Sequence, residues 1–228
     1  MNIVIVGGTS GIGRELWNFY ATRENKVFVL GRRASLLEQM KVERKDHTFI
    51  FPMDITKTEE TRLCIQKIKN ECNRIDLLIV CAGIGDLNES LDYHVEFATI
   101  QTNVVAWTNV VDHSYNIFAE QGNGQLVTIT SVGGLTSSPL APAYAASKAY
   151  QINYTKSLQK KCKGQGITVT EIRPGLVDTA MAKGEGLFWV MPTKKVVQQI
   201  IKAISHKSKM KIVTKRWAFI SFFLKHFL

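Results

Sequence analysis

Short apolar runs alternate with helix-length segments along the whole chain, and this alternation restricts the fold more than any other feature. The runs are "NIVIV" (2–6), "KVFVL" (26–30), "HTFIF" (47–51), "IDLLIV" (75–80), "QLVTIT" (125–130) and "ITVTEI" (167–172), with "MKIVT" (210–214) as a weaker seventh. Most lack a polar face, as do strands buried on both sides of a parallel sheet. Helices are expected at about 11–23, 57–71, 95–120, 142–162 and 193–205. Such alternation predicts βαβ units in a doubly wound α/β sheet.

Length and composition indicate one domain. The 228 residues are enough for a sizeable core, and no linker, repeat or low-complexity segment divides them, so we expect a single domain over 1–228. No run approaches the ~20 apolar residues of a spanning helix. The chain begins directly with a strand, so we expect no signal peptide. The four cysteines form no CxxC pair, and we expect reduced thiols in a cytoplasmic protein.

The net charge of +10 is concentrated at one end of the chain. From Lys183 onward there are ten Lys or Arg residues and one acidic residue, Glu185, so residues 1–182 carry only +1. A chain that bound nucleic acid through a uniformly basic surface would not show this division, and we expect no nucleic-acid partner. Salt-dependent binding of nucleic acid would favour the alternative of a basic scaffold.

A glycine cluster follows the first expected strand. In "VIVGGTSGIGREL", Gly7, Gly11 and Gly13 come directly before or within the start of an expected helix. Glycines there permit a tight turn and close approach of the backbone to a pyrophosphate, which the helix N-terminus then faces. The spacing is Gly-x-x-x-Gly-x-Gly, which differs from the GxGxxG of other dinucleotide-binding proteins. A glycine cluster alone can also be only a tight strand–helix turn, and this is the alternative to a dinucleotide site.

The end of the second expected strand bears on the choice of dinucleotide. NAD-binding proteins commonly place Asp or Glu here to hold the ribose hydroxyls, whereas this chain reads "VLGRRAS", with Arg32 and Arg33 and no acid. A guanidinium pairs well with a phosphate, and Arg14 beside the glycine loop offers another cation. We therefore predict NADP(H), with two solvated arginines at a turn as the alternative.

The stretch "PAYAASKAY" contains a tyrosine with a lysine four residues on. Tyr144 and Lys148 share one face of the expected helix, whereas Tyr150 has no lysine at that spacing. A nearby ammonium favours the phenolate and lowers the pKa of a tyrosine, which makes the phenol a better acid–base group. Ser131 ends an expected strand thirteen residues earlier and is placed to hold a substrate oxygen. The combination is much more specific than a Tyr-x-x-x-Lys pair alone.

Together these motifs make the chain resemble the short-chain dehydrogenase/reductase family, from Asn2 to about Thr179. The matching segments are "GGTSGIG", "TITSVGGL", "YAASK", "QTNVVAW", "RPGLVDT" and "FPMDIT". The resemblance implies a seven-stranded parallel sheet of order 3-2-1-4-5-6-7 with helices on both faces. It also implies an enzyme that interconverts a carbonyl and an alcohol, in which the nicotinamide carries the hydride and the protein supplies position and a proton.

The resemblance further implies roles for individual residues. Tyr144 would donate or take the substrate proton, Ser131 would orient the carbonyl, Lys148 would hold the nicotinamide ribose and tune Tyr144, and Asn103 would belong to a water-linked proton relay to Lys148. Asp54 would contact adenine. The full expected set of cofactor contacts is Gly7, Thr9, Ser10, Gly11, Ile12, Gly13, Arg14, Arg32, Arg33, Asp54, Ile55, Ala82, Gly83, Tyr144, Lys148, Pro174, Gly175, Val177 and Thr179.

Two positions depart from the family pattern. The family usually has Thr where this chain has Val6, and Asn-Asn-Ala-Gly where it has "VCAG", Val80 to Gly83. Losing one member of a buried polar pair costs about 1–3 kcal/mol, whereas losing both is nearly neutral, so we interpret the changes as compensating. We expect Cys81 to act as a small buried apolar residue and His113 to be a surface or interface histidine. No His/Cys cluster predicts a metal.

The C-terminal part of the chain is apolar as well as basic. Residues 180–192, "AMAKGEGLFWVMP", stand where a substrate-covering segment is expected, and Leu187, Phe188, Trp189, Val190 and Met191 predict an apolar pocket or simply a packed lid. Residues 215–228, "KRWAFISFFLKHFL", are too short to cross a bilayer. We expect this tail to pack on the lid or a second subunit, or to lie on a membrane surface with its basic residues at anionic headgroups.

Two functions remain after these steps. We predict an NADP(H)-dependent oxidoreductase acting on a small, apolar molecule, in the form of a homodimer or homotetramer that is cytoplasmic or peripheral at a membrane. The alternative is an NADP(H)-binding regulatory protein without turnover, which tight cofactor binding without activity on a broad carbonyl panel would favour.

Overall fold

The computed structural model describes residues 1–22, 24–182 and 189–219. Its centre is a seven-stranded sheet in the order β3-β2-β1-β4-β5-β6-β7, in which every neighbouring pair is parallel. The predicted doubly wound α/β fold and its strand order are therefore confirmed. The strands are β1 (Asn2–Val6), β2 (Lys26–Gly31), β3 (Thr48–Pro52), β4 (Leu77–Val80), β5 (Gly124–Ile129), β6 (Ile167–Pro174) and β7 (Met210–Val213).

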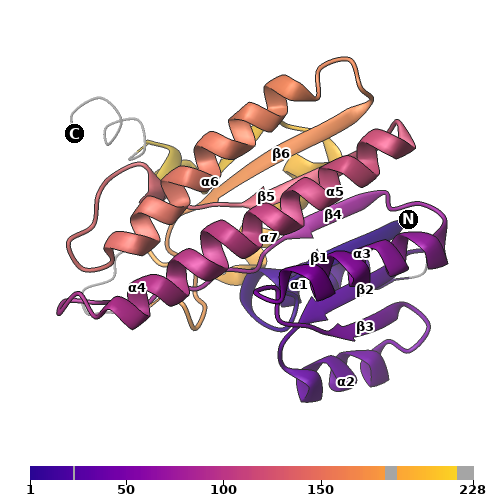
Figure 1. The fold of residues 1–228 in the computed structure, drawn as a ribbon, viewed down its shortest axis with the longest axis horizontal. Coiled ribbons are helices and arrows are strands. Elements are labelled where there is room, and N and C mark those ends of the chain that lie inside the picture. The colour runs from indigo at the N-terminus through magenta and orange to yellow at the C-terminus, as the bar shows by residue number, and fades with distance from the viewer. Residues whose placement is uncertain (23, 183–188, 220–228) are drawn as a thin grey trace.

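Helices cover both faces of this sheet (Figure 1). They are α1 (Gly11–Tyr20), α2 (Ala34–Glu43), α3 (Thr58–Cys72), α4 (Tyr93–Ile100), α5 (Trp107–Gln121), α6 (Pro142–Lys161) and α7 (Thr193–Ser205), with a π-helix η1 (Gln101–Ala106) and a 3₁₀ turn η2 (Val132–Gly134). Buried side chains of α3, α5 and α6 form one core with the sheet, and those of α1, α2 and α7 form the other.

The strands alternate their side chains between these two cores. In β1, Val4 and Val6 pack with α3 and α5, whereas Ile3 and Ile5 pack with α1 and α7. All four side chains are fully buried, which explains why the strand reads as a continuous apolar run instead of an alternating pattern.

Two helical features differ from the sequence-based expectation. The segment "ASLLEQMKVE" forms α2, which was not expected. Only Leu37 and Met40 of this helix are buried, so its sequence shows only a weak helical period of apolar residues. The expected helix at 95–120 is interrupted by η1, which separates α4 from α5. A π-helical turn leaves no clear composition signal, and such turns occur frequently at functional sites.

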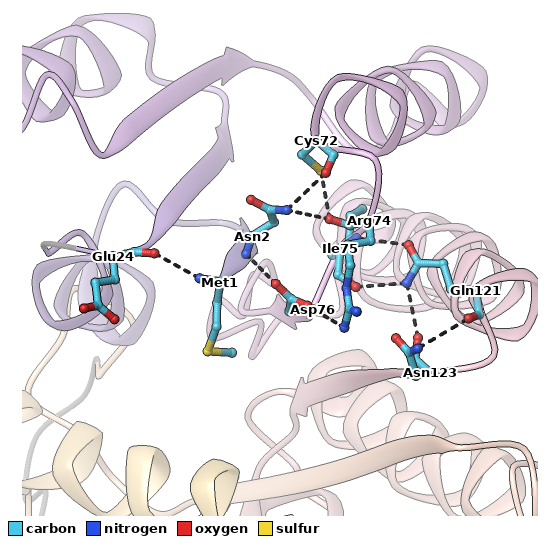
Figure 2. A network of polar contacts seen from close by, with 9 residues as sticks. All are labelled: Met1, Asn2, Glu24, Cys72, Arg74, Ile75, Asp76, Gln121 and Asn123. Carbon is cyan, nitrogen blue, oxygen red and sulfur yellow. Dashed lines mark hydrogen bonds and ion pairs between the residues drawn. The ribbon is translucent and has the colours of Figure 1, made fainter.

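Side chains tie together the amino-terminal ends of β1, β4 and β5 (Figure 2). The Asp76 carboxylate accepts from the Asn2 backbone N–H and pairs with Arg74 at 2.7 Å. The Gln121 amide accepts from the Ile75 N–H and donates to the Ile75 carbonyl, both at 3.0 Å. These contacts satisfy backbone groups at the amino-terminal ends of the strands, at the opposite end of β1 from the glycine loop, so we assign this network to stability.

Candidate active site

The glycine loop lies between β1 and α1. Gly7 has φ +86°, and a Cβ there would lie 2.6 Å from the backbone nitrogen of Ala82. A Cβ on Gly13 would lie 2.2 Å from the Gly7 carbonyl oxygen. Helix α1 begins at Gly11, and the first N–H groups of a helix have no partner within it. Glycine is therefore required for the tight turn itself, and the turn directs a helix N-terminus at the loop, which fits the pyrophosphate of a dinucleotide.

Arg33, the second of the two arginines after β2, lies against this loop. Arg33 donates from Nε and Nη2 to Thr9 Oγ1, at 3.0 and 2.7 Å, and from Nη2 to Ser10 Oγ at 2.6 Å. These partners are neutral hydroxyls, so they leave the guanidinium charge uncompensated beside the glycine loop. Arg32 is exposed and its charge acts on Asp54. The site therefore offers positive charge at the position that the "GRR" sequence predicted.

Arg14 is placed differently from the expectation. Its Nη2 contacts both carboxylate oxygens of Glu43 on α2 at 2.7 Å, and its guanidinium lies 4.4 Å from the centre of the Trp17 ring. Its charge is therefore already compensated by an acidic neighbour. The sequence did not indicate this pairing because α2, which carries Glu43, was not expected.

Asp54 and Ile55 follow β3 on the same edge of the sheet. Burial acts to raise the pKa of Asp54, but hydrogen bonds from the Thr56 N–H and hydroxyl and the charges of Arg32 and Lys57 outweigh it, so the pKa is lowered. The carboxylate is thus held ionised as an acceptor. Ile55 is buried and belongs to the core that the sheet forms with α3, α5 and α6.

The segment after β4 approaches the glycine loop closely. The N–H groups of Cys81 and Ala82 both donate to the Val6 carbonyl, at 2.8 and 2.9 Å. Val6 and Val80 are register partners in β1 and β4, and both are fully buried in the same apolar core. Val6 and Val80 therefore contact the same core, as compensating apolar changes should, whereas Cys81 packs against the core formed with α1, α2 and α7. Burial raises the pKa of the Cys81 thiol to about 12, so this residue is a neutral thiol.

Ser131 and Tyr144 meet at the carboxyl end of β5. Ser131 follows the strand and caps η2, where its Oγ accepts from the Gly133 N–H at 3.0 Å. Removal from water raises the pKa of Tyr144, and a hydrogen bond with the Ser131 side chain acts in the opposite direction. The Tyr144 ring packs so closely on Gly85 that a Cβ there would lie 2.4 Å from it. The predicted serine–tyrosine pair is thus assembled from the segment after β5 and from α6.

Lys148 lies one turn along α6 from Tyr144 and is buried. Its Nζ is 5.8 Å from the centre of the Tyr144 ring and donates to the Ile129 carbonyl at 3.3 Å. Burial lowers the pKa of Lys148 to about 8. The expected lowering of the Tyr144 pKa by Lys148 is not found, because the ammonium is directed at carbonyl acceptors and desolvation of the phenol dominates.

Asn103 lies in η1 and holds the loop that follows β4. Its Oδ1 accepts from the Ile84 N–H at 2.9 Å, and its Nδ2 donates to the Ile84 carbonyl at 2.7 Å and to Ser147 Oγ at 3.1 Å. Its backbone carbonyl accepts from Gln151 Nε2 at 2.8 Å, and Lys148 Nζ donates to Gln151 Oε1 at 2.9 Å. The Gln151 amide therefore connects the Asn103 carbonyl to Lys148 by direct hydrogen bonds.

The segment after β6 completes this edge of the sheet. Thr179 faces the glycine loop, since a Cβ on Gly11 would lie 3.0 Å from its methyl group. Val177 pairs with Met191 in an isolated parallel bridge, which joins the chain before the expected substrate-covering segment to the carboxyl-terminal part of that segment. Pro174 ends β6, and the N–H of Gly175 donates to the Val213 carbonyl at 2.9 Å.

Trp217 also belongs to this region, although it was assigned only to the tail. Its indole packs on Gly175, it is 6% exposed, and its Nε1 donates to the Trp189 carbonyl at 3.4 Å. The start of the tail therefore packs beside the Pro174–Gly175 segment. Leu187 and Phe188 of the expected pocket and residues 220–228 of the tail lie outside the described residues.

Sequence reasoning missed Gln151 and the role of Trp217. A glutamine three residues after the lysine is an ordinary helix residue, and nothing in its pattern signals that both its amide groups face predicted site residues. His113 is half-buried on α5, and burial lowers its pKa. Within the described ranges, no cluster of three or more His, Cys, Asp or Glu side chains suits a metal ion. None of the helices described is long and apolar enough to span a membrane.

Comparison with known proteins gives a consistent result. The family model for short chain dehydrogenases matches residues 1–187. An uncharacterized oxidoreductase of Staphylococcus haemolyticus is 28% identical over 183 residues, which are 79% of this chain and 79% of the relative.

Solved structures show the same fold at lower identity. ElxO with NADP bound has a TM-score of 0.84 and 20% identity over 96% of this chain and 98% of its own. A short chain dehydrogenase from Burkholderia cenocepacia in complex with NADP has a TM-score of 0.86 and 18% identity over 99% of this chain and 92% of its own. With the family match over most of its length, the chain belongs to the short-chain dehydrogenase/reductase family of nicotinamide-dependent oxidoreductases, which act on small molecules.

Proposed function

We propose that this oxidoreductase interconverts a carbonyl and an alcohol, with NADP(H) as cofactor and Tyr144 as proton donor and acceptor. One observation carries the proposal: a serine–tyrosine pair lies beside a buried lysine at the edge of the sheet that also bears the glycine loop. Parallel sheets bind ligands outside the carboxyl ends of their strands.

The side chains support a simple proton step. In the direction of reduction, the Tyr144 phenol transfers its proton to the substrate oxygen as the C=O π bond opens and a hydride adds to the carbon. The hydride is the chemistry that a reduced nicotinamide supplies when bound. Burial raises the pKa of Tyr144, so the phenol is protonated at neutral pH, as a general acid must be. Ser131 is positioned by the Gly133 N–H to hydrogen-bond the same oxygen.

A matched pair of tyrosine variants tests this step. Tyr144→Phe keeps the ring and removes the acid, so turnover should fall by about 10²–10⁴ while cofactor binding persists. Tyr150→Phe is the control, because the contacts of Tyr150 lie outside the Ser131–Tyr144 pair. Its hydroxyl bonds Thr108 at 2.9 Å, and its ring stacks on Tyr154. Equal losses in both variants would contradict the proposal. Cofactor binding by the wild type without turnover on any carbonyl compound would instead indicate the alternative function, that of an NADP(H)-binding regulatory protein.

The preference for NADP(H) rests on Arg33 and Arg32. The hydroxyl-bonded guanidinium of Arg33 provides charge for a 2′-phosphate beside the glycine loop, and the neighbours ElxO and the Burkholderia dehydrogenase have NADP bound. Loss of one charge-assisted hydrogen bond costs about 1.5–3 kcal/mol, so Arg33→Asp should weaken NADPH binding at least about tenfold and leave NADH nearly unaffected. Fluorescence titration measures both, and Arg14→Gln is the control. Tighter NADH than NADPH binding by the wild type would refute this assignment.

The substrate side supports an apolar compound. Trp189 and Met181 stand at the described ends of the covering segment and are 45% and 43% exposed. Apolar side chains exposed at the ends of a segment that is expected to cover the substrate favour substrates that bury hydrocarbon. Turnover should therefore increase along a series of ketones with longer alkyl chains, and a preference for the shortest, most polar member would contradict this part of the proposal.

We propose a homodimer or homotetramer as the assembled form. Helix α4 and the π-helix that follows it expose Tyr93, Phe97, Ile100 and Val105, each between 45% and 69%. Such a row of apolar side chains is costly on a free monomer, and a second copy would cover it. Phe97→Glu should shift the mass measured by light scattering toward the monomer, whereas an unchanged mass would exclude this surface.

For the tail, packing and membrane contact remain the two alternatives. The burial of Trp217 on Gly175 supports packing for the first tail residues. Support for membrane contact comes from a groove of about 780 Å³ between α7 and β7, whose lining includes Lys195, Lys202, His206, Lys211, Lys215 and Arg216 and no acid. Sedimentation with anionic vesicles separates the alternatives, using the full chain, a chain ending at Phe219, and Lys202→Glu/Lys211→Glu. Binding that salt and charge reversal abolish supports membrane contact, and lack of binding by all three leaves packing.

A further inference from the structure

Gln151 is a fully buried polar residue that contacts two predicted catalytic residues at once. It lies on α6, three residues beyond Lys148, and its side chain is 0% exposed. Its Oε1 accepts from Lys148 Nζ at 2.9 Å, and its Nε2 donates to the Asn103 backbone carbonyl at 2.8 Å. Both hydrogen bonds have the length of strong protein hydrogen bonds, so the amide orientation is determined by its two partners.

Asn103 lies in the π-helical turn η1, and such turns occur frequently at functional sites. Its backbone carbonyl accepts a hydrogen bond from a side chain of α6. The Asn103 side chain holds Ile84 at the same time, so this one residue connects α6 to the loop after β4.

We propose that Gln151 is a positioning residue for the reaction: its amide joins the Asn103 carbonyl to the Lys148 ammonium and so fixes that ammonium beside Tyr144. The proposal rests on the proposed function, in which Tyr144 transfers the substrate proton.

The two ends of the amide have different roles. The primary amide keeps a fixed acceptor toward Lys148 and a fixed donor toward Asn103. Its oxygen stabilises the charged lysine, because it accepts a charge-assisted hydrogen bond in a buried site.

The surroundings of Lys148 make Gln151 important for its charge. The ammonium has two carbonyl-type acceptors, Gln151 Oε1 and the Ile129 carbonyl. The titratable groups that face it are the Cys81 thiol after β4 and the Tyr144 phenol on α6. Since burial of both Cys81 and Tyr144 raises their pKa values, neither is an anion at neutral pH. The Gln151 dipole is therefore a main compensating group for the buried charge.

The test follows the ionisation of Lys148 directly as well as the rate. Lysine labelled with ¹³C at Cε is titrated by NMR in the full chain, and the Lys148 signal is assigned by its loss in Lys148→Met. Gln151→Met keeps the volume and removes the acceptor, so the pKa of Lys148 should fall by about one unit. Gln151→Glu places a carboxylate there, so that pKa should rise. The high-pH limb of the reduction rate should move in the same two directions.

The size of the rate effect depends on pH in a defined way. At a pH equal to the wild-type pKa of Lys148, a fall of about one unit in that pKa lowers the protonated fraction of Lys148 about fivefold. At a pH about two units below the wild-type pKa, the same fall changes the protonated fraction little. A general loss of packing would lower the rate at every pH and would not give opposite shifts in the two variants.

Gln159→Met is the matched control. Gln159 is on the same helix and its Nε2 donates to the carbonyls of Val169 and Lys209, but it does not contact Lys148. It should leave the Lys148 titration and the pH profile unchanged. An unshifted Lys148 titration in both Gln151 variants overturns the positioning role. If Tyr144→Phe stays active, the proposed function fails instead, whatever the NMR titration shows.

Discussion

Replacing Gly175 by Ala measures how the start of the tail is attached to the active-site edge. A Cβ at Gly175 would lie 2.1–2.2 Å from three ring carbons of Trp217, whereas carbon atoms in contact are normally about 3.5–4.0 Å apart. The indole would have to move by more than about 1 Å. Such overpacking costs about 1–3 kcal/mol, so Gly175→Ala should lower the free energy of unfolding by that amount. Urea unfolding followed by far-UV circular dichroism gives this value.

A double-mutant cycle with Trp217→Ala identifies the cause. Trp217→Ala alone should cost about 3–5 kcal/mol, because the indole is almost completely buried. Adding Gly175→Ala in that background should cost close to nothing, which gives a coupling energy of about 1–3 kcal/mol. If Gly175→Ala costs the same with and without the indole, Trp217 does not pack on Gly175. The reasoning that attaches the first tail residues to the body would then be refuted.

Three further predictions concern stability and reactivity. Gln121→Ala should lower the free energy of unfolding by about 1–3 kcal/mol, because it leaves the N–H and carbonyl of Ile75 without their side-chain partner; urea unfolding tests this. The pKa of Asp54 is lowered in the fold, so its contribution to stability is present above its unfolded pKa and is lost as pH falls through the folded pKa. The difference in unfolding midpoint between the wild type and Asp54→Asn should accordingly shrink on acidification. Burial raises the thiol pKa of Cys64 to about 11 and of Cys81 to about 12, so iodoacetamide at neutral pH should leave both unmodified in the native protein by mass spectrometry, and modification of either would contradict this.

The strands were easier to predict than the helices. β1 and its neighbours are buried on both faces, so each is a short apolar run that composition reveals directly. Helix α2 buries only Leu37 and Met40, and its exposed remainder has no strong period. Because α2 was missed, the pairing of Glu43 with Arg14 was missed too, and with it the compensation of a cation that had been expected to face the cofactor.

The sequence by itself determined the α/β class, the glycine loop and the family, and it predicted the Ser131–Tyr144–Lys148 set, because each depends on residue types at short spacings. Only the tertiary structure decided how buried charges and amides are paired. Gln151 meets the carbonyl of Asn103, 48 positions away, and Trp217, which follows β7, covers Gly175, which follows β6. The direction of the Tyr144 pKa was decided there as well. Hydrogen bonding and desolvation depend on which distant segments surround a group, and local sequence spacing carries no information about those neighbours.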